Sequence, residues 1–310
     1  MDQMTTIGFI GIGQMGRWMA ERLLKAGYLL TIYDTNLEAA TLLKDKGATV
    51  APSVQALGES NELVITMLPN SSIVESVVAG EGGLLHSMKP DGMIIDMSSS
   101  YALSTKRLAE QVRAAGLTLI DAPVSGGVKG AKAGSLTIMV GAKKDDFMKA
   151  LPVLQCMGKT INLVGETGAG HALKAINNYL SATSLYATTE AMILAKKLGL
   201  NLNIALDTIN QSSGQSFSTH YKFPTFVVNR AFNSGFSLEL LQKDVRMVNM
   251  LARDQKIPIL LGSLVEQIYE SALQSAPNHQ DHTEIVKFLE QITNITLSEG
   301  EEYVDAIKKS

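Results

Sequence analysis

The chain has one cysteine, no block of like charge and no long apolar run. Cys156 is the only cysteine among 310 residues, so an internal disulfide and a cysteine-rich metal site are excluded, and a reducing, cytoplasmic location is expected. Lys and Arg number 27 and Asp and Glu 30, which gives a net charge of −3. Since a nucleic-acid backbone is bound by concentrated positive charge, no nucleic-acid partner is expected.

The apolar runs are far shorter than the roughly 18 residues that a membrane-spanning helix requires, so no membrane partner is expected. Residues 1–6 carry an acid and no basic stretch, which predicts no secretory signal. Apolar residues make up 45% of the chain and charged residues 18%, so a substantial core can form. A length of 310 residues favours two domains.

Short apolar runs alternate with helical patterns in the first half of the chain. Helices are expected near residues 14–26, 37–46, 73–78, 104–115 and 145–157. Strands are expected at residues 7–12, 29–33, 63–67, 93–96, 117–120, 136–140 and 160–164. This alternation predicts an α/β domain over residues 1–165, with a doubly wound, mostly parallel sheet.

The pattern changes after Gly165. Residues 169–198 are nearly free of helix breakers, which predicts one long interdomain helix. Helical periodicity continues over residues 204–210, 237–254, 260–275 and 284–297, so residues 166–310 are predicted to form an all-α C-terminal domain. Because its amphipathic helices form only a modest core alone, this domain is expected to pack against another copy in a homodimer or homotetramer.

A glycine-rich turn directly follows the first predicted strand and opens a helix. Gly11 permits a tight turn, Gly13 lets a pyrophosphate approach the backbone, and Gly16 lets the helix pack close to the strand. The helix N-terminus, with Gln14 and Met15 in the same turn, offers N–H groups and a partial positive charge to the phosphates. The pattern is typical of a Rossmann dinucleotide-binding domain.

Further cofactor contacts are expected at the ends of other strands. Asp34 ends the second strand, 34 − 16 = 18 residues after Gly16, where an acid can accept both ribose hydroxyls of NAD and repel the 2′-phosphate of NADP. Asn36 and the lack of a nearby arginine also favour NAD, with NADP as the alternative. Carboxyl ends of later strands bring Met67, Leu68, Pro69 and Ser98 to the expected cofactor edge, although serine clusters after strands are often turns or caps.

Two further segments carry candidate chemistry. The adjacent glycines Gly126 and Gly127 follow a strand and expose backbone N–H groups, which suits a carboxylate, while a flexible connector is the alternative. Lys174 and Asn178 share one helix face among apolar neighbours. A partly desolvated lysine is suited to proton transfer near neutral pH, whereas a lysine judged on composition alone is more often a surface residue.

At these residues the chain resembles the β-hydroxyacid dehydrogenases. This family includes 3-hydroxyisobutyrate, tartronate semialdehyde and 2-(hydroxymethyl)glutarate enzymes and, more distantly, 6-phosphogluconate dehydrogenase. Four segments match in order: residues 8–16, 121–127, 168–178 and 236–244, of which the second and third are specific to the family. Residues 129–141 and 212–216 look closest to the 2-(hydroxymethyl)glutarate dehydrogenases.

The resemblance implies an EC 1.1.1 oxidoreductase that interconverts a 3-hydroxy acid, such as 3-hydroxyisobutyrate, and its semialdehyde with NAD(P). It makes Lys174 the catalytic acid/base. It places Lys243 and Asp244 at the nicotinamide end of the cofactor. The implied contacts to the substrate, a small carboxylate, are Ser125, Gly126, Gly127 and Asn178.

Several alternatives stay open at this point. The substrate could be tartronate semialdehyde, 2-formylglutarate or sulfolactaldehyde, although sulfolactaldehyde reductases carry an arginine in the loop where this chain has Ser125-Gly126-Gly127. Imine reductases share the architecture but generally lack the counterpart of Lys174. A non-catalytic dinucleotide-binding module is a further alternative, and 6-phosphogluconate dehydrogenase itself is disfavoured by the short chain and the lack of an arginine cluster.

Two smaller features complete the expectations. His220, Tyr221 and Lys222 lie where the helical domain could face the substrate, and Lys222 could meet a second carboxylate. His279 and His282 are three residues apart, but no third ligand is obvious, so no metal site is expected.

Overall fold

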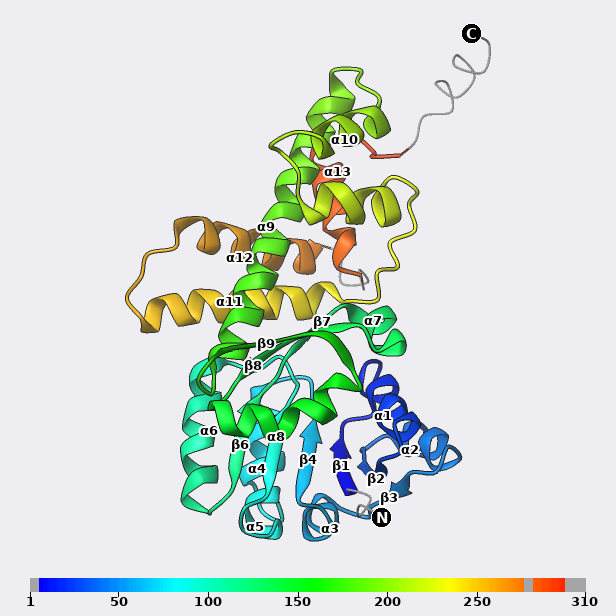
Figure 1. Cartoon of the computed structure of the whole chain (residues 1–310). Helices are drawn as coiled ribbons and strands as arrows, with labels where there is room; N and C mark the ends of the chain where they lie inside the picture. The colour runs from blue at the N-terminus through cyan, green and yellow to red at the C-terminus, as the bar shows by residue number, and fades with distance from the viewer. Residues whose placement is uncertain (1–5, 276–280, 299–310) are drawn as a thin grey trace. The chain divides into compact units, whose positions relative to one another are not determined.

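The computed structural model describes residues 6–275 and 281–298. Its contacts divide the chain into two compact units: the first ends at Lys174 and the second begins at Ala175. Figure 1 shows the sheet and its helices in the first unit and the helices of the second. In the described part of the chain, no helix is both long and apolar enough to cross a membrane.

The first unit is built on a nine-stranded sheet. The spatial order is β3-β2-β1-β4-β5-β6-β8-β7, with β9 beside β8, and all neighbours from β3 to β6 are parallel. β8 runs antiparallel to β6 and β7 and parallel to β9. The strands are β1 (Thr6–Ile10), β2 (Leu29–Tyr33), β3 (Thr49–Val50), β4 (Leu63–Thr66), β5 (Met93–Asp96), β6 (Thr118–Asp121), β7 (Val124–Ser125), β8 (Leu136–Gly141) and β9 (Gly158–Gly165).

Helices cover both faces of this sheet, because the buried strands present apolar side chains on alternating sides. Ile65 of β4 packs with the core that includes α1 (Gly16–Lys25), α2 (Leu37–Lys44), α7 (Gly127–Ala133) and α8 (Lys144–Gln155). Its neighbour Val64 packs in the opposite core, with α3 (Val54–Ser60), α4 (Ser71–Ala79), α5 (Leu84–Ser87) and α6 (Ala102–Ala114). The predicted doubly wound, mostly parallel Rossmann sheet is confirmed.

The regular elements described in the second unit are helices, apart from one isolated β-bridge between Ser237 and Asp281, which confirms the helical C-terminal part. Phe223 and Tyr269 are fully buried in its core, and the Tyr269 hydroxyl donates to the carbonyl of Ala182 at 3.0 Å. The helices are α9 (Ala169–Lys197), which begins in the first unit, α10 (Leu202–Asn210), the π-helix η1 (Ser218–Val227), α11 (Leu238–Asp254), α12 (Leu260–Ser275), the short 3₁₀-helix η2 (His282–Glu284) and α13 (Ile285–Thr293).

The structure differs from the sequence-based expectation in its short and irregular elements. A π-helix with Pro224 inside it lies at residues 218–227, where the sequence pattern predicts no helix. The helix predicted to end at Leu297 ends at Thr293, since Asn294 adopts a left-handed conformation with φ +54°. The predicted domain boundary at residue 165 coincides with the end of β9, whereas contacts assign the first turn of α9 to the first unit.

Candidate active site

The glycine turn after β1 has the shape that a dinucleotide requires. Gly11 has a φ of +97°, and a Cβ there would collide with the carbonyl oxygen of Met67. A Cβ on Gly16 would collide with the carbonyl oxygen of Gly11, so α1 packs directly on the turn. A Cβ on Gly13 would meet nothing within 4 Å, which leaves the backbone open to a pyrophosphate. The residues present therefore fit the expected cofactor.

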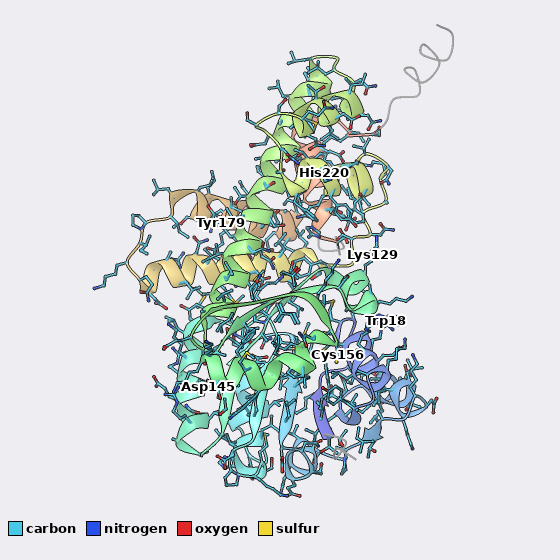
Figure 2. The ribbon with its side chains drawn as sticks, viewed as in Figure 1. Trp18, Lys129, Asp145, Cys156, Tyr179 and His220 are labelled. Carbon is cyan, nitrogen blue, oxygen red and sulfur yellow. The ribbon has the colours of Figure 1, made fainter. Side chains whose placement is uncertain are left out.

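The N-terminus of α1 adds N–H groups without a side-chain cap. Met15 precedes the helix and makes no side-chain capping bond, whereas Asn36 and Asn70 cap α2 and α4. Uncapped N–H groups and the positive end of the helix dipole favour a bound phosphate. Trp18 follows in the same helix, labelled in Figure 2, with the Arg17 guanidinium 5.0 Å from its ring centre.

Asp34 lies beside this turn and is partly exposed. Its Oδ2 accepts the backbone N–H of Ile12 at 2.5 Å, and its Oδ1 accepts that of Asn36 at 2.7 Å. The carboxylate therefore joins the end of β2 to the glycine turn. Each carboxylate oxygen can accept a further hydrogen bond, so the ribose contact expected of Asp34 is compatible with these two bonds.

The ends of β4 and β5 are joined by a buried serine. Ser98 accepts the backbone N–H of Leu68 on its Oγ at 2.9 Å, and its own N–H donates to Asp96 Oδ1 at 3.1 Å. The Thr66 hydroxyl donates to the same Asp96 oxygen at 2.9 Å. Two of the residues predicted at the cofactor edge, Leu68 and Ser98, are thus held together by a direct bond.

A buried cluster of one histidine and two acids, which the sequence did not reveal, lies next to this edge. His171 is 1% exposed, with Nε2 3.7 Å from Asp96 Oδ2 and Nδ1 3.7 Å from Asp121 Oδ2. The ring nitrogens also lie 3.1 Å from the carbonyl oxygen of Ser98 and 2.8 Å from Thr105 Oγ1. Burial raises the pKa of the Asp121 carboxyl, an effect that His171 and two backbone N–H groups oppose.

The Asp121 carboxylate holds the start of α9 against the sheet. Its Oδ1 accepts the N–H of Gly168 at 2.5 Å and its Oδ2 accepts that of His171 at 2.7 Å. Lys174 follows one turn later on the same helix. Asp96 and Asp121 are register partners on the parallel strands β5 and β6. The signal in the sequence was an acid at the end of one predicted strand, 93–96, and another directly after the next, 117–120.

The loop expected to bind a carboxylate is a turn between β7 and α7. Ser125 ends the strand and Gly127 begins the helix, which has no side-chain cap. Gly126 and Gly127 have φ values of +128° and +59°, which L-residues rarely adopt. Both glycines are exposed, so their backbone is accessible to a ligand.

Lys174 and Asn178 are both buried on one face of α9, with exposed fractions of 9% and 6%. Asn178 Nδ2 donates to Asp244 Oδ2 at 2.5 Å, and Asn178 Oδ1 accepts from Asn177 Nδ2 at 3.2 Å. Lys243 Nζ lies 3.5 Å from the other oxygen of Asp244. The second unit thus brings Asn178, Lys243 and Asp244 together.

Metal chemistry finds no support in residues 6–275 and 281–298, where no group of three or more His, Cys, Asp or Glu side chains could hold an ion. His279, one of the two histidines considered above, lies outside the described residues. His282 is buried, and burial lowers the pKa of its imidazole to about 3. His220, labelled in Figure 2, is exposed.

Comparison with known families accounts for almost the whole chain. Residues 6–165 match the NAD-binding domain of 6-phosphogluconate dehydrogenase. Residues 168–289 match the family described as NAD-binding of NADP-dependent 3-hydroxyisobutyrate dehydrogenase. The chain therefore belongs to the β-hydroxyacid dehydrogenase family, as the sequence resemblance indicated.

Individual relatives agree with this assignment. The chain is 36% identical to 2-(hydroxymethyl)glutarate dehydrogenase of Eubacterium barkeri, over 97% of this chain and 100% of the relative. It is 37% identical to the mitochondrial 3-hydroxyisobutyrate dehydrogenase of Homo sapiens, over 93% and 87%. A solved structure of Mycobacterium tuberculosis 3-hydroxyisobutyrate dehydrogenase with L-serine gives a TM-score of 0.84 at 32% identity, over 93% of this chain and 99% of that one.

These relatives make the chain an NAD(P)-dependent oxidoreductase that acts on CH–OH groups and interconverts hydroxy acids and semialdehydes. An imine reductase of Myxococcus stipitatus gives a TM-score of 0.63 at 16% identity, over 93% of this chain and 100% of that one. A likeness at that identity shows a shared fold and nothing more.

Proposed function

We propose that Lys174 is the acid/base of a dehydrogenase for 3-hydroxy acids that carry a carboxylate. The observation that carries this proposal is the burial of Lys174 and Asn178 on one face of α9. A lysine amine in its neutral form can accept the hydroxyl proton as the hydride leaves. In the reductive direction the ammonium form returns that proton to the carbonyl oxygen.

The remaining residues bind and orient. The backbone N–H groups around Gly126 and Gly127 hold the substrate carboxylate together with Ser125, and Asn178 orients the hydroxyl through an amide fixed by Asp244. The bound nicotinamide supplies the hydride acceptor. Fixing both ends of a small acid in this way holds the reacting carbon in one geometry. Such positioning can lower the activation barrier by about 7 kcal/mol in favourable cases.

NAD is proposed as the preferred cofactor. The support is Asp34, whose carboxylate lies beside the glycine turn and would repel the 2′-phosphate of NADP. The proposed cofactor contacts are Gly11, Gly13, Gln14, Met15, Gly16, Asp34, Met67, Leu68, Pro69, Ser98, Lys243 and Asp244.

A cytoplasmic homo-oligomer is proposed as the working form. Cys156 is free, which suits a reducing compartment. The second unit exposes large apolar side chains on α9 and α12, among them Leu180, Leu194 and Leu260 at 60%, 60% and 85%. Exposed apolar surface of this kind is typical of subunit interfaces, and sedimentation equilibrium of the purified chain would give the oligomeric state.

A substrate panel tests the proposed activity. Purified protein with NAD or NADP is mixed with 3-hydroxyisobutyrate, 2-(hydroxymethyl)glutarate, glycerate, 4-hydroxybutyrate and sulfolactate, and reduced nicotinamide is followed by absorbance. We expect turnover of at least one carboxylate-bearing 3-hydroxy acid, with NAD ahead of NADP. Turnover of sulfolactate alone, or of none of the acids in either direction, would contradict the proposal.

A further inference from the structure

Lys222 is a buried cation in the second unit. It lies on the π-helix η1 with an exposed fraction of 5%, and its Nζ donates to Ser181 Oγ at 2.7 Å. It forms no ion pair with a carboxylate in residues 6–275 and 281–298. An ammonium has three N–H donors, and the Ser181 hydroxyl accepts from one of them. The position is thus suited to an anion that comes from outside the chain.

Two titratable groups, His282 and Asp281, lie near Lys222. His282 is held neutral, because burial and the nearby Lys222 charge lower the pKa of its imidazole to about 3. The Asp281 carboxylate attracts Lys222 electrostatically, but it is occupied by bonds to Ser234, to the N–H of Gly235 and to Thr283. Within the described residues Lys222 therefore has no direct ion pair, although the Asp281 charge offsets part of its own.

Helix α9 relates this cluster to the residues of the proposed reaction. Ser181 follows Asn178 by three residues and Lys174 by seven, a spacing that puts all three on one face of a regular helix. Seven residues correspond to about 10 Å along the axis. The Lys222 ammonium, in contact with Ser181, is thus associated with the same face, two turns beyond Lys174.

We propose that Lys222 binds a second carboxylate of the substrate, at the end remote from the carbon that is oxidised, and so selects a hydroxy diacid over a hydroxy monoacid. This inference rests on the proposed function, since it presupposes that α9 presents Lys174 and Asn178 to the substrate. The expected substrate has a short aliphatic chain between its hydroxymethyl carbon and its second carboxylate. π-Helical turns are frequent at functional sites, which agrees with the position of Lys222 on η1.

The test compares a diacid with a monoacid in matched variants. Lys222→Met removes the charge at nearly constant volume, and Lys197→Met removes an exposed lysine of α9 as the control. With NAD, we expect Lys222→Met to lower kcat/KM for 2-(hydroxymethyl)glutarate roughly ten- to a hundredfold, mainly through KM, and to leave 3-hydroxyisobutyrate within about twofold. Equal losses on both acids, or no loss on either, would overturn the proposal.

A binding measurement on the wild-type protein keeps the inference separate from the activity and from the folding of the variant. Glutarate and butyrate are titrated calorimetrically into the full-length protein in the presence of NAD. We expect glutarate to bind at least about tenfold more tightly. Equal affinities for glutarate and butyrate would overturn the role of Lys222, even where 3-hydroxyisobutyrate is oxidised. Failure of the activity panel would contradict the proposed function, and the two affinities would still test Lys222 by themselves.

Discussion

The two oxygens of the Asp121 carboxylate accept the backbone N–H groups of Gly168 and His171, at 2.5 and 2.7 Å. One buried side chain at the end of β6 therefore fixes the first turn of α9. Lys174 lies on the next turn, so its position depends on the bonds that Asp121 makes to the backbone of this helix. Asp121 is in this sense a positioning residue.

Replacement of Asp121 tests that dependence. Asp121→Asn keeps one accepting oxygen and presents an NH₂ group to the other backbone N–H, which leaves a buried donor without a partner. We expect the free energy of unfolding to fall by about 1–3 kcal/mol. We also expect kcat to fall by about tenfold or more with little change in NAD affinity, because Lys174 is displaced.

Denaturant titration and steady-state kinetics measure the two effects of Asp121→Asn. Asp145→Asn is the matched control, since Asp145 is an exposed acid of the first turn of α8, labelled in Figure 2. Its free energy of unfolding should change by less than about 0.5 kcal/mol. Equal stability and turnover of Asp121→Asn and this control would show that the Asp121 contacts do not hold α9.

Asp34 is predicted to determine the choice of cofactor. Asp34→Asn removes the charge that repels a 2′-phosphate while an amide oxygen remains for the Ile12 N–H. We expect kcat/KM with NAD to fall roughly ten- to a hundredfold and the ratio of NAD to NADP efficiency to fall with it. Steady-state kinetics with each cofactor gives this ratio, and an unchanged ratio in the variant contradicts the role assigned to Asp34.

Asp244 is predicted to act through Asn178. The hydrogen bond between Asp244 Oδ2 and Asn178 Nδ2 fixes the orientation of the Asn178 amide, which is proposed to bind the substrate. Asp244→Ala frees that amide, so the KM for the hydroxy acid should rise about tenfold, in line with the loss of a charge-assisted hydrogen bond. Cofactor affinity measured without substrate reports separately on the proposed contact between Asp244 and the cofactor. A change confined to cofactor affinity would instead make Asp244 a cofactor residue only.

Lys222 is predicted to make the free energy of unfolding depend on pH in the alkaline range. Burial lowers the pKa of its ammonium from 10.5 to about 8, an effect that outweighs the nearby Asp281 carboxylate. An amine with a lower pKa in the folded than in the unfolded state binds fewer protons when folded, so the free energy of unfolding rises between pH 8 and 10.5. The increase is at most ~3.4 kcal/mol over this pH range.

Comparison with Lys222→Met separates the contribution of Lys222 from that of the other groups that titrate at high pH. The difference in unfolding free energy, wild type minus variant, should increase with pH over that window. His282 titrates at acid pH and does not contribute there. A difference that stays flat or falls between pH 8 and 10.5 would show that Lys222 is not desolvated in the folded protein.

The regular parts of the fold were predictable from the sequence because burial leaves a strong periodic signal. Strands such as β2 and β5 have the predicted limits, and α9 ends one residue before its predicted end. The π-helix η1 was missed because five-residue hydrogen bonding does not follow the 3.6-residue period. Two-residue strands such as β7 are too short to produce a pattern.

The candidate site was predictable only where motif and local geometry coincide. The glycine turn and the Lys174–Asn178 pair are each contained in one short segment. The cluster of Asp96, Asp121 and His171 was missed because it forms through the pairing of β5 with β6 and the docking of α9, over 73 residues from Ser98 to His171. The burial of Lys222 likewise depends on packing between η1 and α9.

The central claim is that the Lys174 amine moves the substrate proton. The direct measurement is single-turnover oxidation of the best substrate of the panel by NAD-saturated wild type and Lys174→Met, followed by the absorbance of reduced nicotinamide. We expect the rate to fall about 10²- to 10⁴-fold in Lys174→Met while NAD affinity, measured by fluorescence titration, is unchanged. A variant that reduces NAD at the wild-type rate would contradict the account.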